Sequence, residues 1–204
     1  MTFIKKNAWQ PDLISRYNVS GPRYTSYPGA HLFQSDHNKI DHTDALANLA
    51  ERNEPISLYV HIPFCNDICY YCACNKIVTR DKNTARTYLD YLRKEIDLLS
   101  KTIGKPLVVD ALHFGGGTPN FLNAGQLTEL MYLLSNQFNL SSGDHREFSI
   151  EVDPRSITSD TLGLLKGLGF NRLSFGIQDF DPHVQKSINR QQSFAMVKQL
   201  TDSA

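Results

Sequence analysis

Residues 56–74 read ISLYVHIPFCNDICYYCAC, and two different signals meet in this stretch. Its first part, Ile56–Ile62, is rich in β-branched and apolar residues and ends at Pro63, which predicts a β-strand. The second part holds every cysteine of the chain within ten residues: Cys65, Cys69, Cys72 and Cys74. Four thiols crowded on one loop, directly after a strand, indicate a metal centre.

A metal centre explains these cysteines better than disulfide bonds do. A disulfide stabilises a protein mainly by closing a loop of the unfolded chain, and loops this short gain little. Structural zinc sites usually draw two pairs of ligands from separate turns, and no second pair of cysteines is present. Zinc completed by distant histidines remains an alternative. Short spacings between thiolates suit an iron–sulfur cluster, although the ferredoxin pattern C-x2-C-x2-C-x3-C differs from this one.

The spacing also separates one cysteine from the other three. Cys65, Cys69 and Cys72 can reach three corners of a cubane cluster, whereas Cys74, only two residues beyond Cys72, is the least suited to be a corner ligand. Three protein thiolates leave one iron open. An open metal position is where a small molecule binds and where chemistry begins, as in zinc enzymes.

The spacing C-x3-C-x2-C resembles the signature of the radical S-adenosylmethionine (SAM) enzymes. Three further features narrow the resemblance to the family of oxygen-independent coproporphyrinogen III oxidases: the additional Cys74, the approach YVHIPFC (59–65) and the segment GPRYTSYP (21–28). The resemblance covers most of residues 15–200.

The resemblance implies that Cys65, Cys69 and Cys72 bind a [4Fe–4S] cluster, that SAM chelates the fourth iron, and that Cys74 serves catalysis. It also implies contacts with two SAM molecules, and Gln178 and Arg190 match positions that hold the second. The expected SAM-binding residues are Tyr59, Tyr71, Gly115, Gly116, Gly117, Glu151, Gln178 and Arg190.

Several of these residues also have simpler explanations. A glycine run after a strand can form a tight turn, because glycine permits positive φ, or can let the backbone approach a ligand. Tyr59 can pack in the core, and Arg190 can be a solvated charge beside a helix. Glu151 lies in the apolar stretch FSIEVDP, where an unpaired charge is costly, so we expect it to face the rim of the sheet.

Four more residues are weaker candidates. Arg23 and Tyr24 of GPRYTSYP are of the type that meets a substrate carboxylate, since Arg pairs with it bidentately. His61 and His113 lie in predicted strands, and we expect both to serve packing.

Hydrophobic periodicity predicts alternating strands and helices along the chain. The predicted strands are Ile56–Ile62, Val108–Phe114, Glu147–Val152 and Arg172–Ile177. The predicted helices are Thr43–Arg52, Ala85–Thr102, Ala124–Phe138, Thr158–Leu168, Pro182–Ile188 and Ser193–Asp202. Residues 1–50 otherwise read as polar and irregular.

This alternation predicts an α/β fold with a parallel sheet, in which active sites lie at the carboxyl ends of the strands. The cysteines, the glycine run, Glu151 and Gln178 with Asp179 all fall at such ends. The resemblance implies an incomplete (β/α)6 barrel, of which four units are present in residues 53–204, after an arm of residues 1–52 near the substrate. We expect the chain to be the N-terminal portion of a longer enzyme.

The composition argues against several classes of partner. Lys and Arg number 21 and Asp and Glu number 21, so electrostatics gives no case for nucleic acid or a membrane surface. The chain contains no apolar stretch that approaches the roughly 20 residues of a membrane span. Reduced cysteines and the absence of an export signal predict a cytoplasmic protein.

The resemblance implies an oxidoreductase that decarboxylates two propionates of coproporphyrinogen III and so gives protoporphyrinogen IX in haem biosynthesis. It implies a monomer that receives electrons from a donor such as flavodoxin or ferredoxin. Two alternatives remain: a radical SAM relative that binds or modifies haem, and a non-enzymatic iron–sulfur or zinc module. Cys74 favours the decarboxylase, because the haem-handling relatives typically lack this thiol.

Overall fold

The computed structural model describes residues 10–19, 29, 32–33, 39–52 and 54–204. The chain divides into two compact units, residues 1–41 and 42–204. The first unit contains α1 (Pro11–Tyr17), a helix within the segment that we expected to be irregular, and Pro11 at its start suits a first helical turn. Arg23 and Tyr24 lie outside the described residues. The division at residue 52 stays a prediction.

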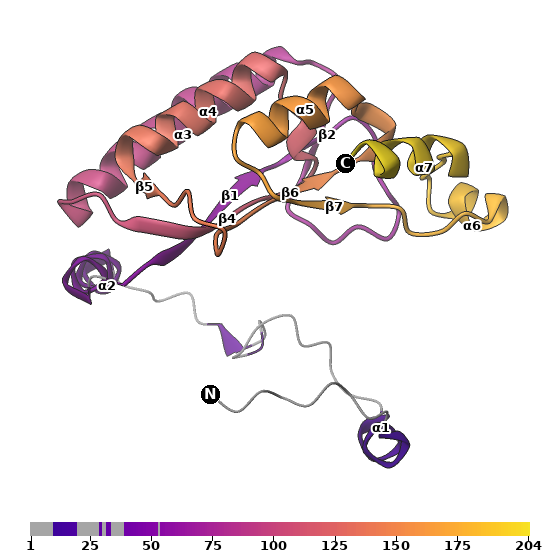
Figure 1. The fold of residues 1–204 in the computed structure, drawn as a ribbon, viewed down its shortest axis with the longest axis horizontal. Coiled ribbons are helices and arrows are strands. Elements are labelled where there is room, and N and C mark those ends of the chain that lie inside the picture. Colours follow the sequence, from indigo (N-terminus) through magenta and orange to yellow (C-terminus); the bar gives the residue numbers. More distant parts are fainter. Residues whose placement is uncertain (1–9, 20–28, 30–31, 34–38, 53) are drawn as a thin grey trace. The chain divides into compact units, whose positions relative to one another are not determined.

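The second unit is built on a parallel sheet, which confirms the predicted α/β class (Figure 1). The strand order is β1-β4-β6-β7, and a short strand, β5, also pairs with β4. The strands are β1 (Ile56–Ile62), β4 (Val108–Gly116), β5 (Asn139–Leu140), β6 (Glu147–Val152) and β7 (Arg172–Phe175).

Three crossover helices cover one face of this sheet (Figure 1). They are α3 (Asn83–Ile103), α4 (Ala124–Gln137) and α5 (Ser159–Gly167). Local signals explain their ends: α3 stops at Gly104, whose φ is +78°, and α4 begins at a capping box between Asn123 and Gln126. The other helices are α6 (Pro182–Ser187), α7 (Phe194–Ser203) and α2 (Lys39–Arg52), which begins in the first unit and lies mostly in the second.

The two faces of the sheet differ in character. Ile62 of β1, Phe114 of β4 and Ile150 of β6 are fully buried against the helices, and each contributes about 1.5–3 kcal/mol through burial. Odd-numbered side chains on the opposite face are polar in three neighbouring strands: Tyr59, His61, His113, Ser149 and Glu151. A parallel sheet is usually apolar on both faces, so a polar face marks the side where chemistry takes place.

Several element bounds differ from the prediction. β4 continues through Gly115 and Gly116, which pair with His61 and Ile62, so the glycines do not break the strand. β7 ends at Phe175, two residues early. The two-residue strands β2 (Phe64–Cys65), β3 (Ile77–Val78) and β5 were not predicted, because two residues carry no alternation signal. No helix in the described ranges combines the length and apolar character needed to cross a bilayer.

Candidate functional site

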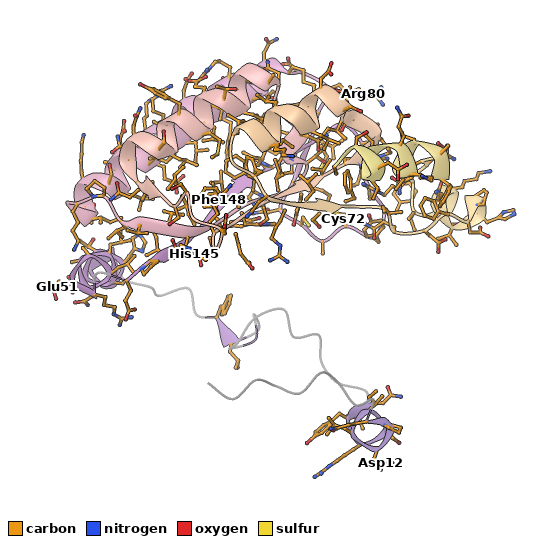
Figure 2. The ribbon with its side chains drawn as sticks, viewed as in Figure 1. Asp12, Glu51, Cys72, Arg80, His145 and Phe148 are labelled. Atoms are coloured by element: carbon orange, nitrogen blue, oxygen red, sulfur yellow. The ribbon has the colours of Figure 1, made fainter. Side chains whose placement is uncertain are left out.

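The four cysteines line one cleft of about 310 Å³ at the carboxyl edge of the sheet. Cys65 is buried at the end of β2, Cys69 and Cys72 are half-buried, and Cys74 is exposed. All four are free thiols. Figure 2 shows Cys72 at the end of the sheet away from His145, which precedes β6. The predicted position of the thiols, directly after the first strand, is confirmed.

The cysteine loop, residues 66–76, begins directly after β2 and ends directly before β3. β2 and β3 pair in parallel, through a bond from the Ile77 amide to the Pro63 carbonyl (2.7 Å). Within the loop, the Cys72 amide donates to the Cys69 carbonyl at 3.0 Å. The Lys76 ammonium, which also lines the cleft, donates to the Cys72 carbonyl at 2.9 Å. These backbone contacts give the loop a defined shape that does not depend on a large apolar core.

The donor set fits an iron–sulfur cluster. Three thiols around one cleft are the ligands that such clusters take. Within the described residues no three His, Cys, Asp or Glu side chains converge on a single point as ligands of one ion would. Burial raises the pKa of Cys65, with Cys72 and Cys69 adding to it, while a bond from the Thr118 hydroxyl (3.5 Å) lowers it. A metal that binds the thiolate must displace that proton.

The glycine run packs tightly against the strand that leads into the cysteines. Gly116 has a φ of +112°, and the Gly117 amide donates to the Ile62 carbonyl at 2.9 Å. A Cβ on Gly116 would lie 2.7 Å from the His61 ring, and one on Gly117 would lie 2.7 Å from the Pro63 carbonyl oxygen. The glycines are therefore required for packing within the protein, in addition to any approach to a ligand.

Glu151 reaches the cleft from β6, at the rim where we expected it. Its Oε2 accepts from the Gly116 amide at 3.3 Å, and its Oε1 lies 3.4 Å from Nε2 of His113. His113 Nδ1 lies 2.7 Å from the Ser149 hydroxyl, so the carboxylate is the end of a polar chain across β4 and β6. Because Glu151 lines the cleft and its side chain is 45% exposed, it can accept hydrogen bonds from a bound molecule.

A second polar chain joins β1 to the end of the cysteine loop. His61 Nε2 donates to the Asn75 carbonyl at 2.9 Å, so Nδ1 is free to accept from the Tyr59 hydroxyl at 3.0 Å. The Tyr59 ring stacks on His113, with centroids 5.7 Å apart. Burial, then the Glu151 charge, raises the pKa of Tyr59. Both His61 and His113 are hydrogen-bonded on the polar face, and the expectation that they serve packing stays a prediction.

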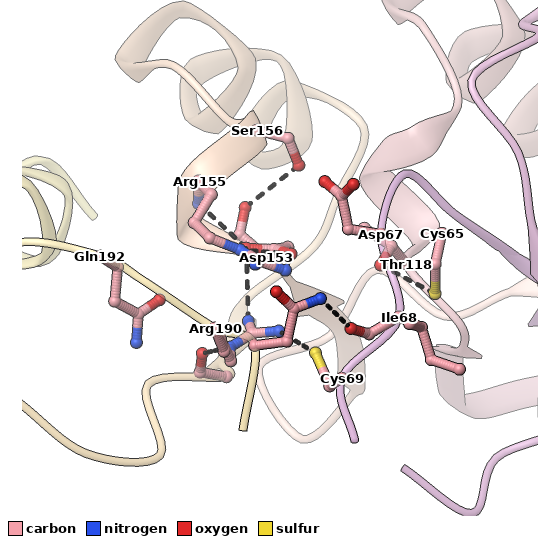
Figure 3. Close-up of polar contacts among 12 residues, drawn as sticks. Cys65, Asp67, Ile68, Cys69, Thr118, Asp153, Arg155, Ser156, Arg190 and Gln192 are labelled. Atoms are coloured by element: carbon pink, nitrogen blue, oxygen red, sulfur yellow. Dashed lines mark hydrogen bonds and ion pairs between the residues drawn. The ribbon is translucent and has the colours of Figure 1, made fainter. Parts of the chain in front are cut away.

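An ion cluster that the sequence did not reveal closes the far side of the cleft (Figure 3). Asp153 binds Arg155 through two nitrogens, at 2.6 Å and 2.9 Å, and lies 3.3 Å from Arg190. Burial would raise the pKa of Asp153, but hydrogen bonds from Arg155 and the charge of Arg190 lower it overall. Arg190 Nη1 also donates to Cys69 Sγ at 3.4 Å.

Arg190 is therefore no solvated charge, since only 7% of the residue is exposed. The signal that could have pointed to Asp153 is its place directly after a strand and before Pro154, on the rim of the sheet.

Two of the remaining candidates, Tyr71 and Gln178, also line the cleft. Burial, followed by the negative charge of Cys69, raises the pKa of Tyr71. Gln178 follows β7 with a φ of +67°, which is uncommon for a residue with a side chain.

The structure thus brings most of the predicted site residues together. Tyr59 and Gly115 lie beside the cleft and do not line it. The predicted residues that line it are Cys65, Cys69, Tyr71, Cys72, Cys74, Gly116, Gly117, Glu151, Gln178 and Arg190. Such a cleft combines soft thiolate ligands, a close backbone and both signs of charge, and can hold a cluster beside a charged small molecule.

Comparison with known proteins places this arrangement in a family. Residues 59–204 match the Radical SAM superfamily. The chain is 49% identical, over 196 residues, to the oxygen-independent coproporphyrinogen III oxidase of Pseudomonas aeruginosa, and this match covers 96% of the chain and 43% of the relative. The protein of that name from Mannheimia haemolytica is 46% identical over 146 residues, which are 72% of this chain and 97% of the relative.

A solved structure shows the same fold. The Escherichia coli coproporphyrinogen III oxidase (HemN), described as a radical SAM enzyme, superposes with a TM-score of 0.83 and 44% identity, over 97% of this chain and 43% of that one. The chain thus spans less than half the length of the Pseudomonas and Escherichia relatives. With the fold, the cysteine spacing and the sequence in agreement, the chain belongs to the radical SAM superfamily and, within it, to the oxygen-independent coproporphyrinogen III oxidase family.

Proposed function

We propose that the protein catalyses the anaerobic oxidative decarboxylation of two propionate side chains of coproporphyrinogen III, giving protoporphyrinogen IX in haem biosynthesis. The observation that carries the proposal is one cleft lined by three spaced thiols, two glycines and Glu151, in a chain 49% identical to a relative named for this reaction. Each conversion removes a hydrogen atom from the propionate β-carbon, releases CO2 and passes one electron to an acceptor, which leaves a vinyl group.

Two cofactors supply the difficult step. When bound, a [4Fe–4S] cluster and SAM provide the 5′-deoxyadenosyl radical that takes the hydrogen atom. Cys65, Cys69 and Cys72 would hold the cluster, because their thiols face the same cleft. Cys74 is exposed at the edge of that cleft and would act in turnover, without holding the cluster.

The other predicted residues, in the cleft and beside it, would bind and orient SAM. The backbone of Gly115–Gly117 can approach the ligand closely, and the Glu151 carboxylate can accept from its amino or hydroxyl groups. Tyr59 and Tyr71 would cover the ligand and exclude water. Gln178 and Arg190 would hold a second SAM molecule, and their place in the cleft supports this assignment.

The partners that we propose follow from the same reaction. A small electron-transfer protein such as flavodoxin or ferredoxin would reduce the cluster, and the enzyme would act as a monomer in the cytoplasm. Equal numbers of acidic and basic residues, 21 of each, support the absence of nucleic acid and membrane partners. Arg23 and Tyr24 remain candidates for meeting a substrate carboxylate.

One experiment separates the proposed function from its alternatives. The protein is reconstituted anaerobically with iron and sulfide, then given SAM, dithionite and coproporphyrinogen III. We expect 5′-deoxyadenosine and a product lighter by two CO2 and four hydrogen atoms, and neither in a Cys65→Ala variant, which should take up no cluster. A colourless protein that retains zinc would contradict the proposal. Cleavage of SAM with an unchanged porphyrinogen would favour a relative that modifies or binds haem.

A further inference from the structure

The cysteine loop touches a turn that lies 121 residues further along the chain. This turn consists of Ile188, Asn189 and Arg190, and we call it the latch. The Tyr70 amide donates to the Ile188 carbonyl at 3.1 Å, and the Asn189 side-chain amide donates to the Ile68 carbonyl at 2.7 Å. The third contact joins Arg190 Nη1 to Cys69 Sγ at 3.4 Å (Figure 3). Three consecutive loop residues therefore meet three consecutive latch residues.

Little apolar burial holds this part of the loop in place. Ile68 is 43% exposed and Tyr70 is 70% exposed. Fixing the backbone of each residue costs about 1–2 kcal/mol of conformational entropy, which a buried side chain would normally offset. Here the hydrogen bonds to the latch offset this entropy cost, because they hold Ile68 and Tyr70, the residues on either side of Cys69.

The latch forms the C-terminal end of α6, where Asn189 takes the left-handed conformation that often follows a helix. Asn189 has a φ of +54°, in the left-handed region that few residues other than glycine and Asn or Asp adopt. The turn is also supported on both of its sides.

Gln185 and Gln192 supply this support on either side of the turn. Both residues are buried, and Gln185 Nε2 donates to the Gln192 carbonyl (2.9 Å) while the Gln192 amide donates back to Gln185 Oε1 (3.0 Å). The Arg190 amide donates to the Gln185 carbonyl at 2.8 Å. These hydrogen bonds make the latch rigid, and the exposed cysteine loop is ordered by its contacts with the latch.

We propose that the latch preorganises the cysteine loop for its iron–sulfur cluster, with Asn189 as a positioning residue that acts through Ile68 on Cys69. The inference rests on the cluster of the proposed function. A loop ordered before the cluster binds loses less entropy on binding, and this slows loss of the cluster. Asn189 touches neither thiol nor cleft and acts only through the loop backbone.

Two substitutions isolate the amide contact from backbone strain. Asn189→Gly keeps the left-handed conformation without cost and removes the side-chain donor. Asn189→Asp keeps the size and the tolerance of this conformation, but a carboxylate cannot donate to the Ile68 carbonyl. Ser187→Ala is the matched control, because the Ser187 hydroxyl, next to the latch, donates to the His183 carbonyl within α6 and to no other group in the part of the chain that the structure describes.

Two measurements on the purified protein test the inference. In the cluster-free protein we expect hydrogen exchange at the Tyr70 amide to rise about three- to tenfold in both Asn189 variants, as expected for one lost hydrogen bond. In the reconstituted protein we expect iron to pass to a chelator faster by a similar factor. Ser187→Ala should leave both rates within about twofold of wild type, as for a contact outside the loop.

The outcomes separate this inference from the proposed function. Wild-type rates of iron loss in both Asn189 variants would overturn the inference and leave the function standing. Faster iron loss in Ser187→Ala as well would also overturn it, because the effect would then belong to α6 as a whole. A wild-type protein that takes up no iron would contradict the function and the inference together.

Discussion

Gly117→Ala offers a sharp test of how the glycine run and the cysteine loop are joined. A Cβ at this position would lie 2.7 Å from the Pro63 carbonyl oxygen, 2.8 Å from the Pro63 carbonyl carbon and 2.9 Å from the Phe64 carbonyl oxygen. All three are backbone atoms, so no side chain can rotate away, and the backbone must shift by several tenths of an ångström. That shift would also strain the bond from the Gly117 amide to the Ile62 carbonyl.

The expected cost follows from this geometry. Overpacking of a tight site costs about 1–3 kcal/mol, and each kcal/mol lowers the melting temperature of a chain of this size by about 2–4 °C. We therefore expect a fall of about 2–12 °C in thermal denaturation of the cluster-free protein, followed by circular dichroism. Because Phe64 adjoins Cys65, we also expect a lower iron content after reconstitution.

Gly163→Ala is the matched control. Gly163 lies exposed within α5, and a Cβ there would meet nothing within 4 Å. Alanine in a helix interior is more favourable than glycine by about 0.5–1 kcal/mol, so the melting temperature should rise slightly. A Gly117→Ala protein that melts at the wild-type temperature would refute the argument from close packing.

The remaining predictions concern Cys74 and Asp153. Cys74→Ala should keep the iron content and the brown colour of the reconstituted protein but lose turnover; loss of iron would show that this exposed thiol is a cluster ligand. The lowered pKa of Asp153 means that its contribution to stability is present above the pKa of the unfolded state and is lost as the pH falls through the folded-state pKa. We expect Asp153→Asn to lower the free energy of unfolding by about 3–5 kcal/mol at pH 7, because it leaves buried arginines without their countercharge. In urea denaturation, the free energy of unfolding of this variant should fall less steeply with decreasing pH than that of the wild type. Glu147→Gln, which breaks an exposed pair with Arg172 (2.7 Å), should change stability by less than about 1 kcal/mol; an equal cost in both variants would contradict the burial argument.

Periodicity and spacing in the sequence determined the framework of this protein. Short apolar runs that end at a proline or at Asp-Pro predicted β1 and β6 with their observed bounds, and the alternation of strands and helices predicted the parallel α/β class. Chain order alone also placed the cysteines and Glu151 at one edge of the sheet, since parallel strands all end on the same side.

Only the tertiary structure decided how the cysteine loop is held. Cys69 and Arg190, or Ile68 and Asn189, lie 121 residues apart in sequence, and no local pattern announces a contact over that distance. The charge of Arg190 reads as solvated from its neighbours along the chain, and its burial beside Asp153 exists only once β6 and the segment after β7 are packed together. Local preferences thus fix the elements, whereas the partners of a buried charge depend on which elements the fold makes neighbours.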